Sequence, residues 1–292
     1  MKPPPFEYHA AASVDEAVAL LAEHGEDAKI LAGGQSLLPL LGIRLAKPAH
    51  LIDIGRISEL SQMSVPGSPG NGSVRIGAGV RQRAAERSAD LAAANPLLGK
   101  AIPLIGHVPI RSRGTIGGSV AHADPAAELP AAMLLTNAEM VLRSTSGERV
   151  VAAADFFEGF LVTTARPDEL LVELRIPAFP TGAGASFREV VRRNGDFALV
   201  GAGAIVAVGD GGIISDARLA FIGVAGTAVR SPEAEALLIG QTPSADLLAA
   251  ASAAAADAID PSSDIHATGA YRRHVARVLA AQVLQEAIAD AR

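Results

Sequence analysis

The sequence predicts an α+β protein whose C-terminal third forms a layer of its own. Helix-like and strand-like runs alternate up to Pro177, and after it three β-rich runs precede three helix-like segments. The 292 residues, of which 49% are hydrophobic, suit two to three subdomains, because a domain usually contains about 100–200 residues. We expect boundaries that give residues 1–56, 57–177 and 178–292.

The first part is predicted to contain a helix and two strands. Ser13 and, three residues later, Glu16 are typical of a capping box, which predicts a helix that continues to about Glu23. The runs 29–32 and 50–54 predict strands, and a Gly-Gly pair ends the first of them abruptly. This part therefore has the alternating pattern of an α/β unit.

The second part is predicted to contain a longer alternation of helices and strands. A turn-rich segment at 66–72 separates two strand-like runs. The strands expected after this turn are 74–79, 138–143, 148–152 and 170–176, of which the second and third form a hairpin. Helical patterns cover 81–105, with interruptions at Pro96 and Pro103, and 126–135.

The third part is predicted to be a three-stranded antiparallel sheet followed by helices. The expected strands, joined by short turns, are 185–192, 198–208 and 213–223. The expected helices are about 232–239, 244–259 and 268–290. Ser231 and Pro232 suit the N-cap and first position of the first of these helices.

Composition excludes several classes of function. A net charge of −6 disfavours nucleic acid as a partner, because phosphate binding needs a surplus of Lys and Arg. The absence of cysteine excludes disulfides, thiolate nucleophiles and cysteine-ligated iron–sulfur clusters on this chain. No stretch is apolar and long enough to span a membrane, and the first residues do not resemble a signal peptide. We expect a soluble, cytoplasmic protein.

Two glycine loops are the strongest candidates for a binding site. The first contains Gly33-Gly34 followed by Ser36, and the second, 114–119, contains Gly117-Gly118. Glycine lets the backbone approach a ligand closely, and successive N–H groups in such a turn form a concave nest for phosphate oxygens. The backbone amides of both pairs are therefore predicted to hold a diphosphate without a cationic side chain. A single Gly-Gly pair would more often be an ordinary turn.

Other candidate residues leave structural and functional interpretations open. His122 and Asp124 offer too few ligands for a metal site, and Asp124 suits the cap of a helix that begins near Pro125. Arg111 and Arg113 either neutralise a diphosphate or lie exposed on the surface. No GxGxxG, GxxxxGK[ST] or GxSxG motif occurs in the chain.

The loops and their flanking residues resemble the FAD-binding medium subunits of the xanthine dehydrogenase and carbon monoxide dehydrogenase group, which are molybdenum hydroxylases. The resemblance covers nearly the whole chain. It rests on the segments 32–39, 115–119 and 123–130, with further matches at 157–160, 169–177 and 193–198. Two such loops about 80 residues apart are more specific than either loop alone.

The resemblance implies an FAD-binding fold of the vanillyl-alcohol-oxidase (PCMH) type. Residues 1–56 and 57–177 would be the two subdomains that hold FAD, and 178–292 would be the α+β domain that covers it. The cofactor-binding residues that it implies are Leu31, Ala32, Gly33, Gly34, Gln35, Ser36, Leu37, Ile105, Thr115, Ile116, Gly117, Gly118, Ser119, Asp124, Glu128, Leu171, Arg188 and Phe197. It implies no catalytic acid or base and no metal ligand on this chain.

Particular roles follow from the same resemblance. The two loops would cradle the diphosphate, and Glu128 would contact FAD near its adenosine part. Ile105 and Leu171 would pack on the flavin or the adenine. Arg188 would lie near the cofactor, and Phe197 would shield the isoalloxazine ring.

The implied function is electron transfer within a larger enzyme. A large subunit would hydroxylate the substrate at a molybdenum cofactor, and a small subunit with two [2Fe–2S] clusters would pass electrons to FAD, in a dimer of heterotrimers. The absence of cysteine agrees with clusters on another chain. Two alternatives stay open: a stand-alone flavin oxidase or reductase, for which His122 is the best acid–base candidate, and a scaffold subunit without cofactor.

Overall fold

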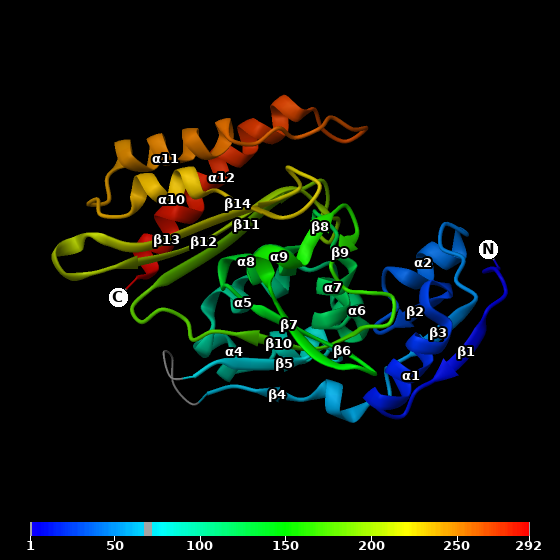
Figure 1. The fold of residues 1–292 in the computed structure, drawn as a ribbon. Coiled ribbons are helices and arrows are strands. Elements are labelled where there is room, and N and C mark those ends of the chain that lie inside the picture. The colour runs from blue at the N-terminus through cyan, green and yellow to red at the C-terminus, as the bar shows by residue number, and fades with distance from the viewer. Residues whose placement is uncertain (1, 67–71, 292) are drawn as a thin grey trace.

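The computed structural model describes residues 2–66 and 72–291, so the turn expected at 66–72 lies mostly outside the described residues. Figure 1 shows three sheets in a row, with the N-terminal sheet at one end of the molecule and the C-terminal layer at the other. In the described part of the chain, no helix has the length and apolar content needed to cross a membrane.

The N-terminal part is a small parallel sheet with one covering helix. Strands β1 (Glu7–Ala10), β3 (His50–Asp53) and β2 (Ala28–Leu31) lie side by side in that order. Helix α1 (Val14–His24) begins as predicted, because the Ser13 hydroxyl accepts a hydrogen bond from the Glu16 N–H at 3.1 Å. Its apolar stripe buries Val18 and Leu21 against the strands. A short helix, α2 (Leu37–Gly42), follows β2. The 3₁₀ turn η1 (Gly25–Asp27) lies between α1 and β2.

The middle part is built on a five-stranded sheet with the order β4-β5-β10-β6-β7. These strands are β4 (Met63–Ser64), β5 (Val74–Gly77), β10 (Leu170–Ile176), β6 (Glu139–Ser144) and β7 (Gly147–Ala152), so the predicted hairpin is confirmed. The remaining short elements are η2 (Ser58–Ser61), α9 (Ala153–Phe156) and the two-stranded β8 (Phe157–Gly159) and β9 (Val162–Thr163).

The segment 81–105 is more fragmented than its prolines predict. It forms α3 (Gln82–Glu86), α4 (Ala89–Ala94), α5 (Pro96–Ala101) and the 3₁₀ turn η3 (Ile102–Leu104). The breaks at Pro96 and Pro103 were expected, whereas the break at Ser88 was not. The Ser88 hydroxyl accepts from the Leu91 N–H at 3.1 Å, so this side chain starts a new helix.

Helices α6 (Val108–Arg113), α7 (Ile116–His122) and α8 (Glu128–Leu135) follow. The prediction that α8 begins near Pro125 with Asp124 as its cap is wrong. Asp124 Oδ1 accepts from the Ala126 N–H at 2.8 Å, which closes a local turn before the helix. Ala127 is the N-cap, so Glu128 becomes the first helical residue.

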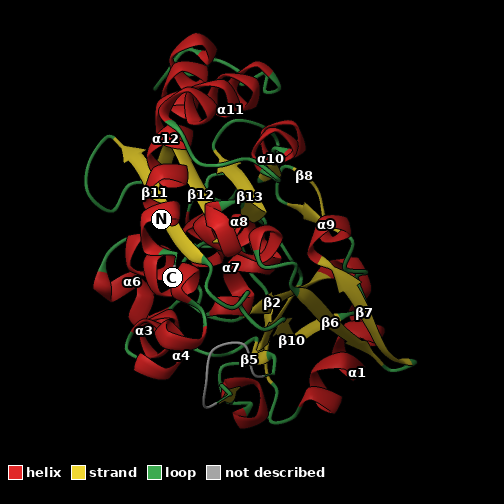
Figure 2. Ribbon diagram, turned by 90° about the vertical axis from the view of Figure 1, so that its left-hand side faces the viewer, coloured by secondary structure: helices red, strands yellow, loops and turns green. Residues whose placement is uncertain are grey.

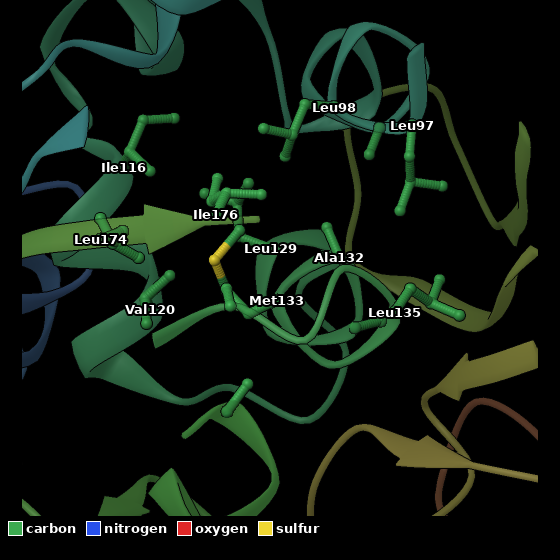
Figure 3. Packing of buried hydrophobic residues seen from close by; sticks show 14 of the residues in the cluster. Leu97, Leu98, Ile116, Val120, Leu129, Ala132, Met133, Leu135, Leu174 and Ile176 are labelled. Atoms are coloured by element: carbon green, nitrogen blue, oxygen red, sulfur yellow. The ribbon is translucent and has the colours of Figure 1, made fainter. Parts of the chain in front are cut away.

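Helices α5, α7 and α8 and strand β10 share one core. Figure 3 shows Leu97 and Leu98 of α5, Ile116 and Val120 of α7, and Met133 of α8 converging on β10. All eight residues of α8 are buried, which explains why the segment after Glu128 is apolar on every side and not amphipathic. The core therefore fixes α7, and with it the second glycine loop, against the sheet.

The C-terminal part is a sheet with the order β11-β12-β13-β14 and a helical cover. Its strands are β11 (Gly184–Val191), β12 (Ala198–Val208), β13 (Ile214–Ile222) and β14 (Val229–Arg230); the turn η4 (Asp210–Gly212) joins β12 to β13. The helices are α10 (Pro232–Leu238), α11 (Ala245–Asp257) and α12 (Gly269–Asp290). The expected count of three strands is corrected to four, because β14 is too short to show alternation.

This sheet has two buried faces. Val200, Ala204 and Val206 of β12 pack with α10, α11 and α12, whereas Ile205 belongs to the core of the middle part. Figure 2 shows the three helices stacked on one side of the sheet and α8 on the other. The sheet therefore joins the C-terminal helices to the part of the molecule that holds the glycine loops.

Candidate functional site

The two glycine loops are in direct contact. A Cβ on Gly33 would lie 2.5 Å from the Arg113 carbonyl oxygen and 2.6 Å from the Gly114 Cα. One on Gly118 would lie 3.4 Å from the Ala32 Cβ. Only a residue without a side chain permits the first of these approaches. Segments 80 residues apart are therefore brought together at the carboxyl end of β2.

The first loop presents a row of free donors. It begins after Leu31, the last residue of β2, and Ser36 precedes the first residue of α2, Leu37. Gly34 has a φ of +74°, and the Gln35 side chain donates back to the Gly33 carbonyl at 3.1 Å. In the part of the chain that the structure describes, the backbone N–H groups of residues 33–36 have no acceptor. They form the nest that the sequence predicted.

The second loop differs from expectation, because its glycine amides are occupied. Thr115 is the N-cap of α7, and its hydroxyl accepts from the Gly118 N–H at 3.0 Å. The Gly117 N–H donates to the Ala78 carbonyl at 3.0 Å, and a Cβ on Gly117 would overlap Ala78. These glycines permit close packing and are not the predicted phosphate donors. The half-buried Ser119 hydroxyl is the polar group that this loop offers to a ligand.

Two carboxyl groups have raised pKa values: Glu128 is buried, and Glu189 is half-buried. Burial, with a smaller contribution from the negative charges of Glu189 and Asp124, raises the pKa of Glu128 to about 8. Burial alone raises the pKa of Glu189, on β11, to about 7. The Glu189 Oε2 atom is buried and has no hydrogen-bond partner among the described residues. Both carboxyls are therefore available, when protonated, as hydrogen-bond donors.

Glu189 was missed in the sequence, although a sign of it was present. The expected strand 185–192 alternates, with Ala185 and Phe187 on its apolar face. Glu189 falls on the same face by period two, so an acid interrupts an otherwise buried row. Such an acid is a candidate for a functional group with a shifted pKa.

Arg188 lies beside a surface cleft of about 420 Å³ that Leu104, Phe187 and Glu189 also line. Its Nε donates to Glu286 Oε1 of α12 at 2.7 Å. About half of its side chain is exposed, and Nε and Nη2 both lie at Glu286 Oε1. Arg188 thus lies next to Glu189 in the cleft and is paired with Glu286 of helix α12.

The apolar candidates and Arg111 occupy the core beside the loops. Ile105 and Leu171 are both buried in the same hydrophobic cluster as Ile116. The Ile105 carbonyl accepts from Arg111 Nη1 at 2.8 Å. Arg111 is buried and bound internally, so it does not fit the idea of a cation at the diphosphate, whereas Arg113 is exposed.

Phe197 is the most exposed of the predicted residues, with 67% of its surface accessible. It lies on the loop between β11 and β12. Gly195, two residues earlier, has a φ of +85° and packs directly against the His107 ring. His107 is therefore a packed residue that supports this loop, and among the described residues no hydrogen bond or ion pair links Phe197 to the glycine loops.

The arrangement fits a flavin dinucleotide. Four successive free amides suit the oxygens of a diphosphate, and the adjoining apolar residues suit an aromatic ring system. The carboxyls of Glu128 and Glu189 remain neutral below pH values of about 8 and 7, so they do not repel an anionic ligand. In the described residues, no group of histidines and acids that could hold a metal ion lies at this site.

Comparison with known proteins matches two family models in sequence order. Residues 4–179 match the FAD binding domain in molybdopterin dehydrogenase. Residues 185–287 match the carbon monoxide dehydrogenase flavoprotein C-terminal domain. The first match alone covers more than half of the chain, and together they leave only short segments unmatched.

Individual relatives agree with these models over their full lengths. The chain is 41% identical to the 6-hydroxypseudooxynicotine dehydrogenase complex subunit alpha of Paenarthrobacter nicotinovorans, over 100% of this chain and 97% of that one. It is 40% identical to the carbon monoxide dehydrogenase medium chain of Hydrogenophaga pseudoflava, over 98% of both. A solved structure of Hydrogenophaga pseudoflava carbon monoxide dehydrogenase, lacking the Mo-pyranopterin moiety, superposes with a TM-score of 0.95, 40% identity and full coverage of both chains.

Proposed function

The chain belongs to the FAD-binding medium subunits of the molybdenum hydroxylases, and we propose that it holds the FAD diphosphate on residues 33–36, where this loop meets residues 113–119. The family gives the chain its role as the electron-transfer subunit of an oxidoreductase. The observation that carries the proposed location is the contact of Gly33 with Gly114 beside four free backbone amides.

Each part of the loop pair has a separate task in this proposal. The amides of residues 33–36 bind the phosphate oxygens, and Gly34 supplies the left-handed backbone that aims them at one point. Thr115 fixes the first turn of α7, and Ser119 adds a hydroxyl donor. When bound, FAD supplies the redox chemistry, and the chain positions it and sets its surroundings.

The carboxyls of Glu128 and Glu189 adjust the charge of the site. Burial disfavours the ionised forms of both groups, so Glu128, with a pKa of about 8, is mostly protonated at neutral pH, and Glu189, with a pKa of about 7, is about half protonated. Neutral carboxyls donate hydrogen bonds to the cofactor without repelling its phosphates. Ile105 and Leu171 exclude water from its apolar parts, and Phe197 covers the ring from its exposed loop.

The relatives are subunits or medium chains of larger enzymes, and these names support a subunit over a stand-alone flavin oxidase or a cofactor-free scaffold. We further propose a small subunit with [2Fe–2S] clusters and a large subunit with the molybdenum cofactor as partners, in a dimer of heterotrimers. The division at 1–56, 57–177 and 178–292 and the cytoplasmic location remain predictions.

A pair of glycine substitutions tests the proposed diphosphate position. Gly33→Ala places a methyl group 2.5 Å from the Arg113 carbonyl oxygen and must separate the two loops. Gly42→Ala, in the adjoining helix α2, meets no atom within 4 Å and serves as the control. The readout is the ratio of bound FAD to protein, from the visible absorption of the purified chain.

We expect the control to retain its full complement of FAD and Gly33→Ala to lose most of it. Circular dichroism would establish that both variants keep the secondary structure of the parent chain. If folded Gly33→Ala bound FAD with unchanged affinity, the proposed position of the diphosphate would be wrong.

A further inference from the structure

Three histidines from separate elements of the N-terminal part meet on one face of its sheet. His9 lies on β1, His24 in the last turn of α1, and His50 at the start of β3. One ring nitrogen of each lies within 4.8 Å of one nitrogen of each of the others. All three side chains are partly buried, so the surrounding fold holds them in place while solvent and ions can still reach them.

The spacing of the nitrogens suits a shared metal ion. His9 Nε2 and His50 Nδ1 are 3.1 Å apart. Two nitrogens bound to one tetrahedral zinc ion, each at about 2.0–2.1 Å, lie about 3.3 Å from each other. The His24 and His50 rings stack almost parallel with centroids 3.7 Å apart, so the third imidazole is close by, and the His24 ring must turn about its side-chain bonds before its nitrogen points at the same ion. In the chain without metal, His9 Nε2 and His50 Nδ1 are joined by a hydrogen bond.

The surroundings favour a cation. Glu7 Oε2 lies 3.6 Å from His50 Nδ1, and the Glu7 side chain is largely exposed, so it can turn to serve as an oxygen ligand. His24 stands at the carboxyl end of α1, where the helix dipole stabilises positive charge. Imidazole ligands select zinc, copper and nickel over magnesium and calcium.

The cluster is separate from the glycine loops. His50 pairs with Ala28 at the amino end of the parallel strands, whereas the first loop leaves the opposite end of β2 after Leu31. In Figure 1 this sheet, with β1 on its outer edge, forms one end of the molecule. An ion bound here would act on the N-terminal part without touching the cofactor.

We propose that His9, His24 and His50 bind one divalent transition-metal ion such as Zn²⁺, with Glu7 as a fourth ligand. The ion joins β1, α1 and β3, which are also linked by backbone pairing, by a small apolar core and by the hydrogen bond from the Tyr8 hydroxyl to Asp53. It replaces the hydrogen bond between His9 and His50 and stabilises the N-terminal part when bound.

The test uses the full chain with its FAD and without any histidine tag. Isothermal titration with Zn²⁺ gives stoichiometry and affinity, and the electron paramagnetic resonance spectrum of added Cu²⁺ shows the number of nitrogen ligands. The variants are His9→Gln, His24→Gln and His50→Gln, with the exposed His274→Gln of α12 as the matched control.

We expect one Zn²⁺ per chain, a copper spectrum with nitrogen couplings, and an unchanged flavin spectrum. Each cluster variant should weaken binding by more than about tenfold, because even outer-shell substitutions cost about 10–100-fold in metal affinity. His274→Gln should bind like the parent. Parent protein that binds Zn²⁺ no better than the cluster variants would overturn the proposal, and loss of FAD on Gly33→Ala would be unaffected by that result.

Discussion

Arg111 and Glu86 form a bidentate ion pair that ties helix α6 to helix α3. Arg111 Nε lies 2.8 Å from Glu86 Oε2, and Arg111 Nη2 lies 3.0 Å from Oε1. The remaining nitrogen, Nη1, donates to the carbonyls of Ile105 and Gly106. The side chains are only 7% and 13% exposed, so the pair is shielded from water and sets the backbone that leads into the second glycine loop.

Arg111→Ala should destabilise the chain strongly. It leaves the carboxylate of Glu86 and two carbonyls buried without their partner, and breaking a buried pair costs about 3–5 kcal/mol. Arg83→Ala is the control, because Arg83 binds the same carboxylate from a more exposed position. Its loss should cost no more than about 1 kcal/mol. Urea denaturation measures both, and equal effects would show that Arg111 is not the main partner.

Acid should weaken the same ion pair. The hydrogen bond from Arg111 lowers the pKa of Glu86 to about 2, below its usual 4.5. The folded chain therefore binds fewer protons than the unfolded chain, and this contribution to stability is present above about pH 4.5 and lost as the pH falls through about 2. The free energy of unfolding should fall more steeply between pH 5 and 3 in the parent than in Arg111→Ala. Parallel profiles would contradict the assignment to this pair.

The contribution of Glu128 to the free energy of unfolding should change with pH in the opposite direction. Burial raises its pKa to about 8, so the folded chain binds more protons than the unfolded chain between the usual 4.5 and that value. The contribution is fully present below about pH 4.5 and is lost as the pH rises through about 8. Glu128→Gln should therefore flatten the decline in the free energy of unfolding of the FAD-free chain from pH 5 to 8.

Two further variants make that result specific. Glu189→Gln should flatten the decline up to about pH 7, because burial raises the pKa of this carboxyl to about 7. Glu139→Gln, on an exposed position of β6, should leave the profile as it is in the parent. If all three variants show the same decline in the free energy of unfolding with pH as the parent, Glu128 and Glu189 do not have the raised pKa values described above.

Thr115 should contribute a measurable cap to α7. Thr115→Ala removes the acceptor of the Gly118 N–H and should cost about 1 kcal/mol, within the range of about 0.5–2 for such caps. Thr115→Ser keeps the hydroxyl and should retain most of the stability. Denaturation of the FAD-free proteins gives the comparison. A Ser variant as unstable as the Ala variant would mean that the methyl group matters and not the cap.

Local features of the fold were predictable because they depend on neighbouring residues. The cap at Ser13 and the strand run that becomes β12 (Ala198–Val208) follow from short-range pattern. The approach of the two glycine loops was also expected, because Gly-Gly turns suit a shared diphosphate, and the resemblance added support. The break at Ser88 was missed, because helical periodicity hides a serine that caps a second helix.

Tertiary pairings were not predictable from the sequence. His9, His24 and His50 have no ligand spacing of a known motif, and they meet because β1 pairs with β3 and α1 packs on this sheet. Arg111 was left open between the surface and the diphosphate, because nothing local shows that Glu86, 25 residues earlier, would bury it. Likewise, the occupation of the Gly117 amide depends on where Ala78 lies in the fold.

The order of the elements along the chain affects how the protein is made. Helix α12 covers one face of the sheet that contains β12, and its last residue, Asp290, lies 68 residues after the end of β13 at Ile222. At synthesis rates of about 5–20 residues/s, the ribosome needs on the order of 3–14 s to add that stretch. During this interval Val200, Val206 and their neighbours are not yet covered by α12. Nascent chains can then associate with one another through this apolar face or bind a chaperone.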